Sequence, residues 1–307
     1  LLNGVSIVSL VSLLLFFNYL NTLFTNGDTA NSTVANSTLV NSTVATSRNF
    51  YGILTIKDVE VNGKIERRLI DGSTSHGTQS QSTELEHIPM SYYRRDTGVA
   101  LALEHLFPMM NIKVGLIGLG AGTLAAYSRS GDNYTFYELN PAVESMAWRY
   151  FSYLEDSKGD IDIILGDGRV SLTNELASGK TNDYQVLVLD AFSGDSVPAH
   201  LLTIEAFELY FKHLDDNGIL AIHVSNSHLD LTSLTRGLAS SLNKSSIYVQ
   251  TEADQDEVNQ TQWVLITNNS LFLNNSRVKN LVSPWPNTTD KNIVWTDDYS
   301  NLLSVLK

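Results

Sequence analysis

The chain has 307 residues, of which 43% are hydrophobic and 17% charged, a composition typical of a globular protein with a sizeable core. Its formal net charge of −13 disfavours a nucleic-acid partner, because the phosphate backbone requires a basic face, and leaves room for a cationic substrate. The chain has no cysteine, so disulfides, thiolate nucleophiles and cysteine–zinc sites are excluded.

Residues 5–24 are uncharged and mainly apolar, and this run is about as long as a bilayer-spanning helix requires. We therefore expect residues 1–24 to form a transmembrane segment, either as a membrane anchor or as the last span of a longer membrane protein. A signal peptide is the competing interpretation, but its basic opening residues are missing. Because the chain begins with Leu1 instead of Met, we expect a fragment or a processed product. The side of the membrane stays open, since no basic residue precedes Arg48.

Residues 25–48 are rich in Asn, Ser and Thr, which predicts a polar linker with little to bury. The linker contains N-x-S/T sequons. They would be glycosylation sites if the chain passed through a secretory pathway, and are plain polar residues otherwise.

The next segment, residues 49–95, is expected to form a small N-terminal β-hairpin domain. Alternating residues predict strands at about 50–61 and 64–70, and Asn62–Gly63 is typical of the tight turn between them. Residues 76–98 are expected to form a loop, followed by a helix.

Residues 96–307 alternate between short apolar runs and helical patterns. This alternation predicts an α/β fold with a parallel, doubly wound, Rossmann-like sheet that forms the second domain. A strand at 261–269 is expected to pair antiparallel at the sheet edge, and 294–306 to form a capped short helix or a loop. The parallel strands are expected at 113–119, 133–139, 161–167, 184–192 and 218–226, with helices between them, for example at 142–155 and 203–214.

The carboxyl ends of the predicted strands carry glycines and acids, and ligands of doubly wound sheets bind at these ends. The GxGxG turn of Gly118, Gly120 and Gly122 allows the backbone to approach a ligand closely, although a purely structural turn is the alternative. Dinucleotide sites usually have a sixth-position glycine, where this chain has Thr123. NAD is therefore disfavoured.

Two acids follow the next strands. Glu138 ends the second strand, where a carboxylate can accept both hydroxyls of a ribose, and the alternative is a cap-like acid before Pro141. Asp167 follows the third strand and can accept a hydrogen bond from an adenine amino group, although Asp-Gly also favours turns. A ribose acid and an adenine acid without a phosphate cradle together favour an adenosine-sulfonium ligand.

Asp190 closes the fourth strand, and Asp195 follows it in a loop. Two carboxylates at the mouth of a sheet can hold an ammonium group and remove its proton, although each can instead be a cap or loop acid. His76 and His200 can line the pocket, and no paired metal-ligand spacing occurs, so no metal is predicted. Three histidines in helical or strand patterns are expected to be structural: His105, His213 and His223. Three aromatic residues either wall a cation site or pack in the core: Tyr92, Tyr93 and Trp295.

Several stretches between about residue 50 and residue 304 resemble the spermidine/spermine synthase (aminopropyltransferase) superfamily, in particular its membrane-fused branch. They are HGTQ, PMSYY, GLIGLGAGTLAAY, FYELNP, LGDGR, LVLDAFSGDSVPAHLLTIEAFELYFKHL, GILAIHVSN and WTDDYSNLL. The resemblance implies a small N-terminal β-domain over a methyltransferase-like Rossmann core, with an adenosyl-sulfonium donor between them. An amine would attack the carbon next to the sulfonium and release methylthioadenosine, with no metal or further cofactor.

The resemblance also implies roles for individual residues. Asp190 would orient and deprotonate the acceptor amine. Glu138 would bind the ribose of the donor, and Asp167 with Gly168 the adenine. Other matching positions approach the donor or the acceptor: Gln79, Tyr92 and Tyr93, with His76 and Asp195 as further substrate contacts.

The chain departs from the family pattern at Ala121. The resemblance implies a GGGDG turn whose Asp holds the ammonium of decarboxylated S-adenosylmethionine, and here the turn reads GLGAG. An alanine removes that ion pair and also the repulsion against a donor carboxylate. The donor therefore stays open between decarboxylated S-adenosylmethionine and S-adenosylmethionine. HGTQ also departs from the usual DGxxQ.

The leading hypothesis is a membrane-associated aminopropyltransferase-like enzyme that acts on a polyamine-type amine. An S-adenosylmethionine-dependent methyltransferase, or another enzyme that cleaves the sulfonium, is the second hypothesis, and Ala121 favours it. The third is a non-catalytic sensor domain that binds polyamine or nucleotide. Asp190 argues against the sensor, because a binding domain needs no base. A homodimer is an open alternative for the assembly.

Overall fold

The computed structural model describes residues 41–191, 198–252, 260–286 and 293–307. All of these ranges belong to one compact unit. The predicted transmembrane segment 1–24 lies outside the described residues, as does the linker up to residue 40. Within the described ranges, every helix is too short or too polar to cross a bilayer.

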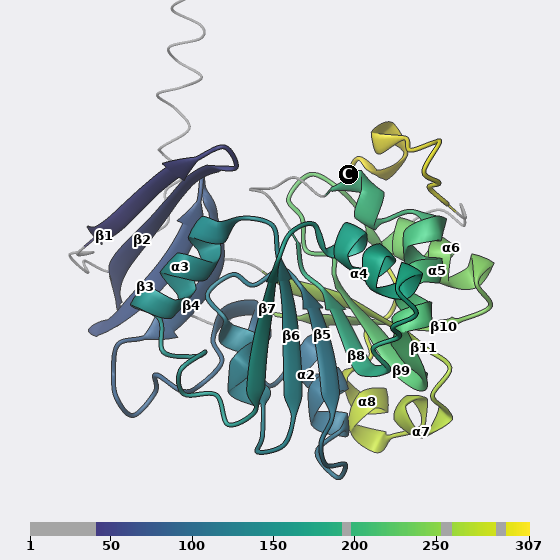
Figure 1. The fold of residues 1–307 in the computed structure, drawn as a ribbon, viewed down its shortest axis with the longest axis horizontal. Coiled ribbons are helices and arrows are strands. Elements are labelled where there is room, and N and C mark those ends of the chain that lie inside the picture. The colour runs from purple at the N-terminus through teal and green to yellow at the C-terminus, as the bar shows by residue number, and fades with distance from the viewer. Residues whose placement is uncertain (1–40, 192–197, 253–259, 287–292) are drawn as a thin grey trace, which may run out of the picture. The chain divides into compact units, whose positions relative to one another are not determined.

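A small antiparallel sheet opens the described chain, with its strands in sequence order (Figure 1). The predicted hairpin is confirmed: strands β2 and β3 pair along their length, and Asn62 and Gly63 between them have φ of +52° and +77°, as a two-residue hairpin turn requires. The strands are β1 (Asn41–Asn49), β2 (Gly52–Val61), β3 (Lys64–Asp71) and β4 (Thr74–Ser80).

Two of these strands differ from the sequence predictions. Strand β1 begins at Asn41, inside the segment predicted as linker, and β4 occupies HGTQS, which was predicted as loop. Both segments are polar, and β1 is mostly exposed. They become strands because their backbones pair with β2 and β3. Backbone pairing does not require alternating apolar side chains, so the sequence shows no pattern that predicts these strands.

The large sheet has the order β10-β11-β9-β8-β5-β6-β7. Five strands are parallel, as predicted, and β11 pairs antiparallel with β9. The prediction that this antiparallel strand forms the edge was wrong, because β10 lies outside it. The strands are β5 (Lys113–Ile117), β6 (Asn133–Glu138), β7 (Asp160–Leu165), β8 (Tyr184–Leu189), β9 (Leu214–His223), β10 (Ser245–Thr251) and β11 (Thr261–Thr267).

Helices cover both faces of the large sheet, with α4, α5 and α6 on one side and α2 on the other (Figure 1). Strand β8 shows why: Val186 and Val188 join one core cluster, and Leu187 and Leu189 join the other. The helices are α2 (Gly98–His105), α3 (Pro141–Tyr150), α4 (Gly168–Ala177), α5 (Ile204–His213), α6 (Thr232–Ser241), α7 (Ser270–Leu273) and α8 (Ser276–Leu281).

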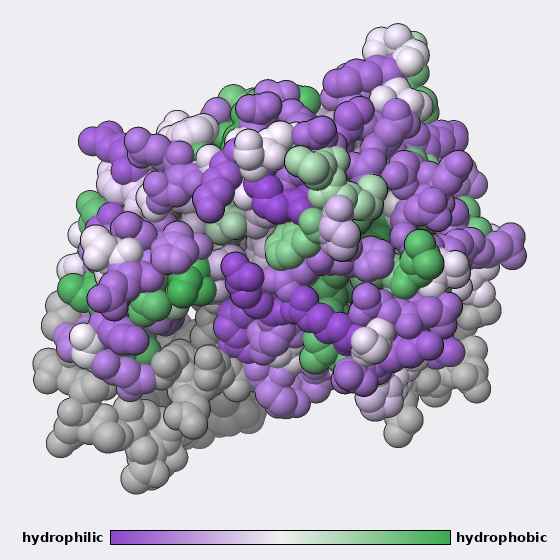
Figure 2. All heavy atoms as spheres, turned by 90° about the horizontal axis from the view of Figure 1, so that it is seen from below, coloured by the Kyte–Doolittle hydropathy of each residue, from purple (hydrophilic) through white to green (hydrophobic). Residues whose placement is uncertain are grey.

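On the face drawn in Figure 2, hydrophilic side chains of the described residues predominate, and hydrophobic ones form small separate groups.

The strand order reverses between β5 and β8, and a doubly wound sheet opens a crevice at such a point, beyond the carboxyl ends of its strands.

Candidate active site

A pocket lies at this reversal point, between the small sheet and the carboxyl ends of β5, β6, β7 and β8. The small sheet contributes Leu54 and Leu69 to its wall. Most of the predicted site residues line it: His76, Tyr92, Tyr93, Gly118, Gly120, Glu138, Asp167, Gly168, Asp190 and His200.

The glycine turn after β5 is held by two close backbone approaches. Gly118 has φ +104°, and a Cβ there would lie 2.3 Å from the carbonyl oxygen of Asp190. Gly120 has φ +54°, and a Cβ there would lie 2.3 Å from the carbonyl oxygen of His76. Only glycine fits both positions, so the turn lies directly against β4 and the end of β8.

Ala121 is packed away from the pocket. It is fully buried and absent from the pocket lining, and its N–H donates to the His76 carbonyl at 3.0 Å. A Cβ at Gly77 would lie 2.5 Å from the Ala121 Cβ. Position 121 therefore supplies a methyl group that seats the small sheet and no charge for a donor.

We expect Gly77→Ala to lower the free energy of unfolding by about 1–3 kcal/mol, because the new Cβ collides with Ala121 and strains a φ of +134°. Urea unfolding measures the loss. The double variant with Ala121→Gly should recover part of it, because the collision disappears while the strain stays. A single variant as stable as the wild type would contradict this packing.

Glu138 lies at the end of β6 with its carboxylate buried beside the glycine turn. One oxygen accepts the N–H of Leu119 at 3.0 Å and the other accepts the N–H of Asn140 at 2.7 Å. Burial raises the pKa of the Glu138 carboxyl, although the backbone hydrogen bonds oppose the rise. Each carboxylate oxygen can accept a further bond, so the pair can take two neighbouring hydroxyls.

Asp167 is both the cap of a helix and a wall of the pocket. Its Oδ1 accepts the N–H of Val170 at 2.9 Å, which caps α4, and its Oδ2 lies 2.8 Å from Nε2 of His200. Gly168 follows, where a Cβ would lie 2.8 Å from Ile117. The structural and the functional interpretation of Asp167 are therefore compatible.

Asp190 follows β8 and is held by two neighbours. Its Oδ2 accepts the hydroxyl of Tyr93 at 2.5 Å, and its Oδ1 lies 2.7 Å from Nδ1 of His223. Burial alone would raise the pKa of the carboxyl, but His223 and Tyr93 outweigh it, and the pKa is lowered. The pocket therefore contains a desolvated carboxylate that stays ionised.

Sequence reasoning expected a structural role for His223, and the structure places it beside Asp190. Its ring stacks with Tyr92 at 4.6 Å and with Trp263 at 4.8 Å between centroids. The available signal was its position: His223 ends β9, the strand next to β8, so its side chain reaches the same sheet edge as Asp190.

His76, on β4, faces the pocket, and burial lowers its pKa. Its Nε2 is buried, and no hydrogen-bond partner for it lies among the described residues. A buried polar atom without a protein partner is costly, so this nitrogen is available to a ligand.

Two predicted site residues, Gln79 and Gly122, lie outside the pocket lining. The amide of Gln79 is buried and bonds to Ser152 and to the Glu86 carbonyl, outside the pocket lining. Gly122 packs against Leu154. Asp195 lies outside the described residues.

Comparison with known proteins gives matches both in sequence and in fold. No protein-family model matches the chain. It is 24% identical over 180 residues to a probable polyamine aminopropyl transferase of Bifidobacterium longum, covering 58% of this chain and 36% of that protein. It is 32% identical over 113 residues to a polyamine aminopropyltransferase of Vibrio vulnificus, covering 35% and 36%. The chain thus spans about a third of the length of these curated relatives.

Solved structures match over most of the chain. A spermidine synthase from Thermotoga maritima has a TM-score of 0.55 at 14% identity, covering 83% of this chain and 81% of that one. A probable spermidine synthase from Corynebacterium glutamicum has a TM-score of 0.58 at 16% identity, covering 77% and 85%. The chain therefore has the fold of these spermidine synthases.

A third sequence match is to a different activity. Over 109 residues the chain is 30% identical to an N-terminal histidine N-methyltransferase of Emericella nidulans, covering 35% of this chain and 19% of that protein. Among solved structures, a spermidine synthase in complex with the transition-state analogue AdoDATO has a TM-score of 0.52 at 13% identity, covering 83% and 81%.

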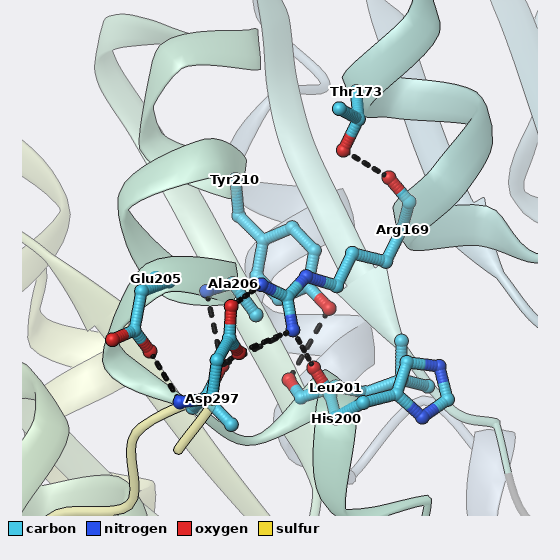
Figure 3. A network of polar contacts seen from close by, with 9 residues as sticks. Arg169, Thr173, His200, Leu201, Glu205, Ala206, Tyr210 and Asp297 are labelled. Carbon is cyan, nitrogen blue, oxygen red and sulfur yellow. Dashed lines mark hydrogen bonds and ion pairs between the residues drawn. The ribbon is translucent and has the colours of Figure 1, made fainter.

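A polar network fixes one wall of the pocket (Figure 3). Arg169, next to the Asp167–Gly168 turn, donates to both carboxylate oxygens of Asp297 at 2.7 and 2.6 Å. It also donates to the carbonyl of His200 at 2.7 Å. Arg169 thereby joins the start of α4, the segment that carries His200, and the C-terminal WTDDY stretch.

We expect Asp297→Asn to lower the free energy of unfolding by about 1 kcal/mol, a small value because the Asp297 side chain is 44% exposed. The Arg169 hydrogen bond lowers the pKa of Asp297. The contribution of Asp297 to stability is therefore present above its unfolded-state pKa and lost as the pH falls through its folded-state pKa. Thermal unfolding measured across pH should show that the difference in melting temperature between Asp297→Asn and wild type shrinks on acidification. Asp298→Asn is the exposed control, and an equal loss there would contradict the role of Asp297.

Proposed function

We propose that the chain transfers an aminopropyl group from a decarboxylated S-adenosylmethionine-type donor to a polyamine-type amine and releases methylthioadenosine. The observation that carries this proposal is the Asp190 carboxylate, held by Tyr93 and His223 in the same pocket as Glu138 and the glycine turn. The two curated relatives named as polyamine aminopropyltransferases support it.

In the proposed complex the strand ends bind the donor. Glu138 accepts the ribose hydroxyls, and Asp167 with Gly168 lies beside the adenine. The apolar wall from the small sheet covers the propyl chain. Nε2 of His76, which has no hydrogen-bond partner among the described residues, takes a polar group of a substrate. Gln79 and Asp195 stay as proposed substrate contacts, although the Gln79 amide is already bonded within the fold.

The proposed reaction is an in-line displacement. An acceptor amine arrives as an ammonium ion, and Asp190 takes its proton. The free amine then attacks the carbon next to the sulfonium, the N–C bond forms, and the C–S bond breaks. The electron pair of the broken C–S bond goes to sulfur and neutralises the sulfonium. Tyr93 and His223 hold the carboxylate in place, and the apolar wall excludes water from the donor carbon.

Methyl transfer from S-adenosylmethionine is the second candidate. Two observations favour it: Ala121 supplies no charge for the donor ammonium, and a 109-residue match is to a histidine N-methyltransferase. In that case the same carboxylate would deprotonate an acceptor nitrogen before it attacks the methyl group.

Product analysis separates the two candidates. The full chain is incubated with each donor in turn, with and without putrescine, and the products are identified by mass spectrometry. Methylthioadenosine together with a polyamine longer by one aminopropyl group would support the proposal. Adenosylhomocysteine would replace it with methyl transfer. A chain that neither consumes nor binds either donor would overturn both.

We also propose that residues 5–24 attach the protein to a membrane, as their apolar, uncharged sequence suggests. Fractionation of cells that make the full chain tests this, because an integral protein stays with the membrane after a carbonate wash. Leu14→Lys should release it, and a wild-type chain in the supernatant would refute the anchor.

A homodimer is likewise a proposal, tested by the mass of the protein in solution.

A further inference from the structure

We propose that His223 is the positioning residue of the base: Ser225 fixes its tautomer, and its Nδ1–H holds the Asp190 carboxylate toward the acceptor amine. The kinetic part of this inference rests on the proposed function. The tautomer and the hydrogen bonds do not, because they are properties of the free protein.

The hydrogen bonds of Ser225 determine which nitrogen of His223 carries the proton. The Ser225 Oγ accepts the backbone N–H of Gln262 at 2.8 Å. Its own O–H can point to Nε2 of His223 at 2.8 Å or to the Gln262 carbonyl at 3.5 Å, and the shorter contact is the stronger hydrogen bond. Nε2 is then the acceptor, so the proton of the neutral ring lies on Nδ1.

Nδ1–H donates to Asp190 across 2.7 Å. The side chains of His223 and Asp190 are only 8% and 6% exposed, so water competes little for this bond. With Tyr93 on the other oxygen, each carboxylate oxygen receives one donor, and donors of this kind favour the ionised form. The acid–imidazole pair thus works as in a serine protease, with the roles exchanged: here the carboxylate reacts and the imidazole orients it.

Among the described residues, the other groups that face Asp190 do not replace His223. Tyr93, from the turn before α2, has a pKa raised well above its ordinary value, first by burial, so it stays a neutral donor. His76, from β4, has its pKa lowered by burial, so it is a neutral neighbour without a hydrogen bond to the carboxylate. Tyr92 stacks on the His223 ring and fixes its plane. His223 is therefore the group whose removal changes the base most directly.

Two substitutions at this position separate the donor from the packing. His223→Phe keeps an aromatic ring against Tyr92 and Trp263 but removes the N–H, and we expect kcat/KM to fall about 10- to 100-fold. Because the lost donor favoured the ionised form, the pKa of Asp190 rises and the acidic limb of the kcat/KM profile moves to higher pH. His223→Asn restores an amide N–H near the Nδ1 position and should keep most of the rate and the wild-type limb.

The matched control is His87→Phe, at an exposed histidine away from the pocket, which should leave both rate and profile unchanged. A purely structural role for His223 would instead lower stability in the Asn variant, which loses the stacking, and would not move the limb in the Phe variant. A His223→Phe enzyme with the wild-type rate and profile overturns the proposal.

A measurement without turnover tests the tautomer itself. In ¹⁵N-histidine-labelled full chain, the NMR signals of His223 should show a protonated Nδ1 and an unprotonated Nε2. Ser225→Ala should change that pattern, because the donor to Nε2 is lost. A His223 protonated on Nε2 alone overturns the proposal. If the wild-type chain turns over neither donor, the proposed function fails, and the NMR result still decides the hydrogen-bond arrangement.

Discussion

Replacing Asp190 by asparagine is expected to lower the rate of transfer by about 10²- to 10⁴-fold, because the variant cannot take the proton of the acceptor ammonium. The substitution keeps the shape of the side chain at the end of β8. Binding of methylthioadenosine should stay within a few-fold of wild type, because the proposed nucleoside contacts are Glu138 and Asp167. Steady-state kinetics and calorimetric binding measure the two effects separately.

The pH profile gives this prediction a second check. His223 and Tyr93 outweigh the effect of burial and lower the pKa of Asp190. The carboxylate therefore stays ionised at pH values below those at which an ordinary aspartate takes up its proton. We therefore expect the acidic limb of the kcat/KM profile to lie lower than for an ordinary aspartate, and to disappear in Asp190→Asn. Full turnover by the variant would remove Asp190 from the mechanism.

Replacing Glu138 by glutamine is expected to weaken methylthioadenosine binding about tenfold or more and to lower the free energy of unfolding by about 1–3 kcal/mol. The two buried N–H groups of Leu119 and Asn140 each donate to a carboxylate oxygen. An amide offers one oxygen, so one of these N–H groups would face an NH₂. Calorimetry and urea unfolding measure the two losses.

The pH dependence of nucleoside binding follows from the same site. Because burial raises the pKa of Glu138, binding should weaken on acidification at a higher pH than an ordinary glutamate would give. Glu155→Gln, an exposed acid on the loop after α3, is the matched control. A Glu138→Gln protein that binds methylthioadenosine as the wild type does would show that the ribose lies elsewhere.

The sequence by itself determined the doubly wound core and the position of three acids at the carboxyl ends of its strands. Short apolar runs alternate with helices, and both faces of β8 are buried, so the parallel sheet follows from hydrophobic periodicity. Once the sheet is parallel, the residues after its strands share one edge. Glu138, Asp167 and Asp190 could therefore be assigned to one pocket without coordinates.

The tertiary structure decided what depends on contacts between distant segments. Strands β1 and β4 are polar and form through backbone pairing, which leaves no hydrophobic pattern to read. The amide of Gln79 is bonded within the fold because Ser152 lies beside it, 73 positions away in the sequence.

The roles of Ala121 and His223 needed the structure for the same reason. Ala121 looked like a lost donor contact, and the fold shows its methyl group against Gly77 of β4. His223 looked like a strand residue, and it touches Asp190 only because β9 lies next to β8 in the sheet. Local periodicity fixes which side of a strand a residue faces, whereas its partner across the sheet is set by strand order, which no short stretch of sequence contains.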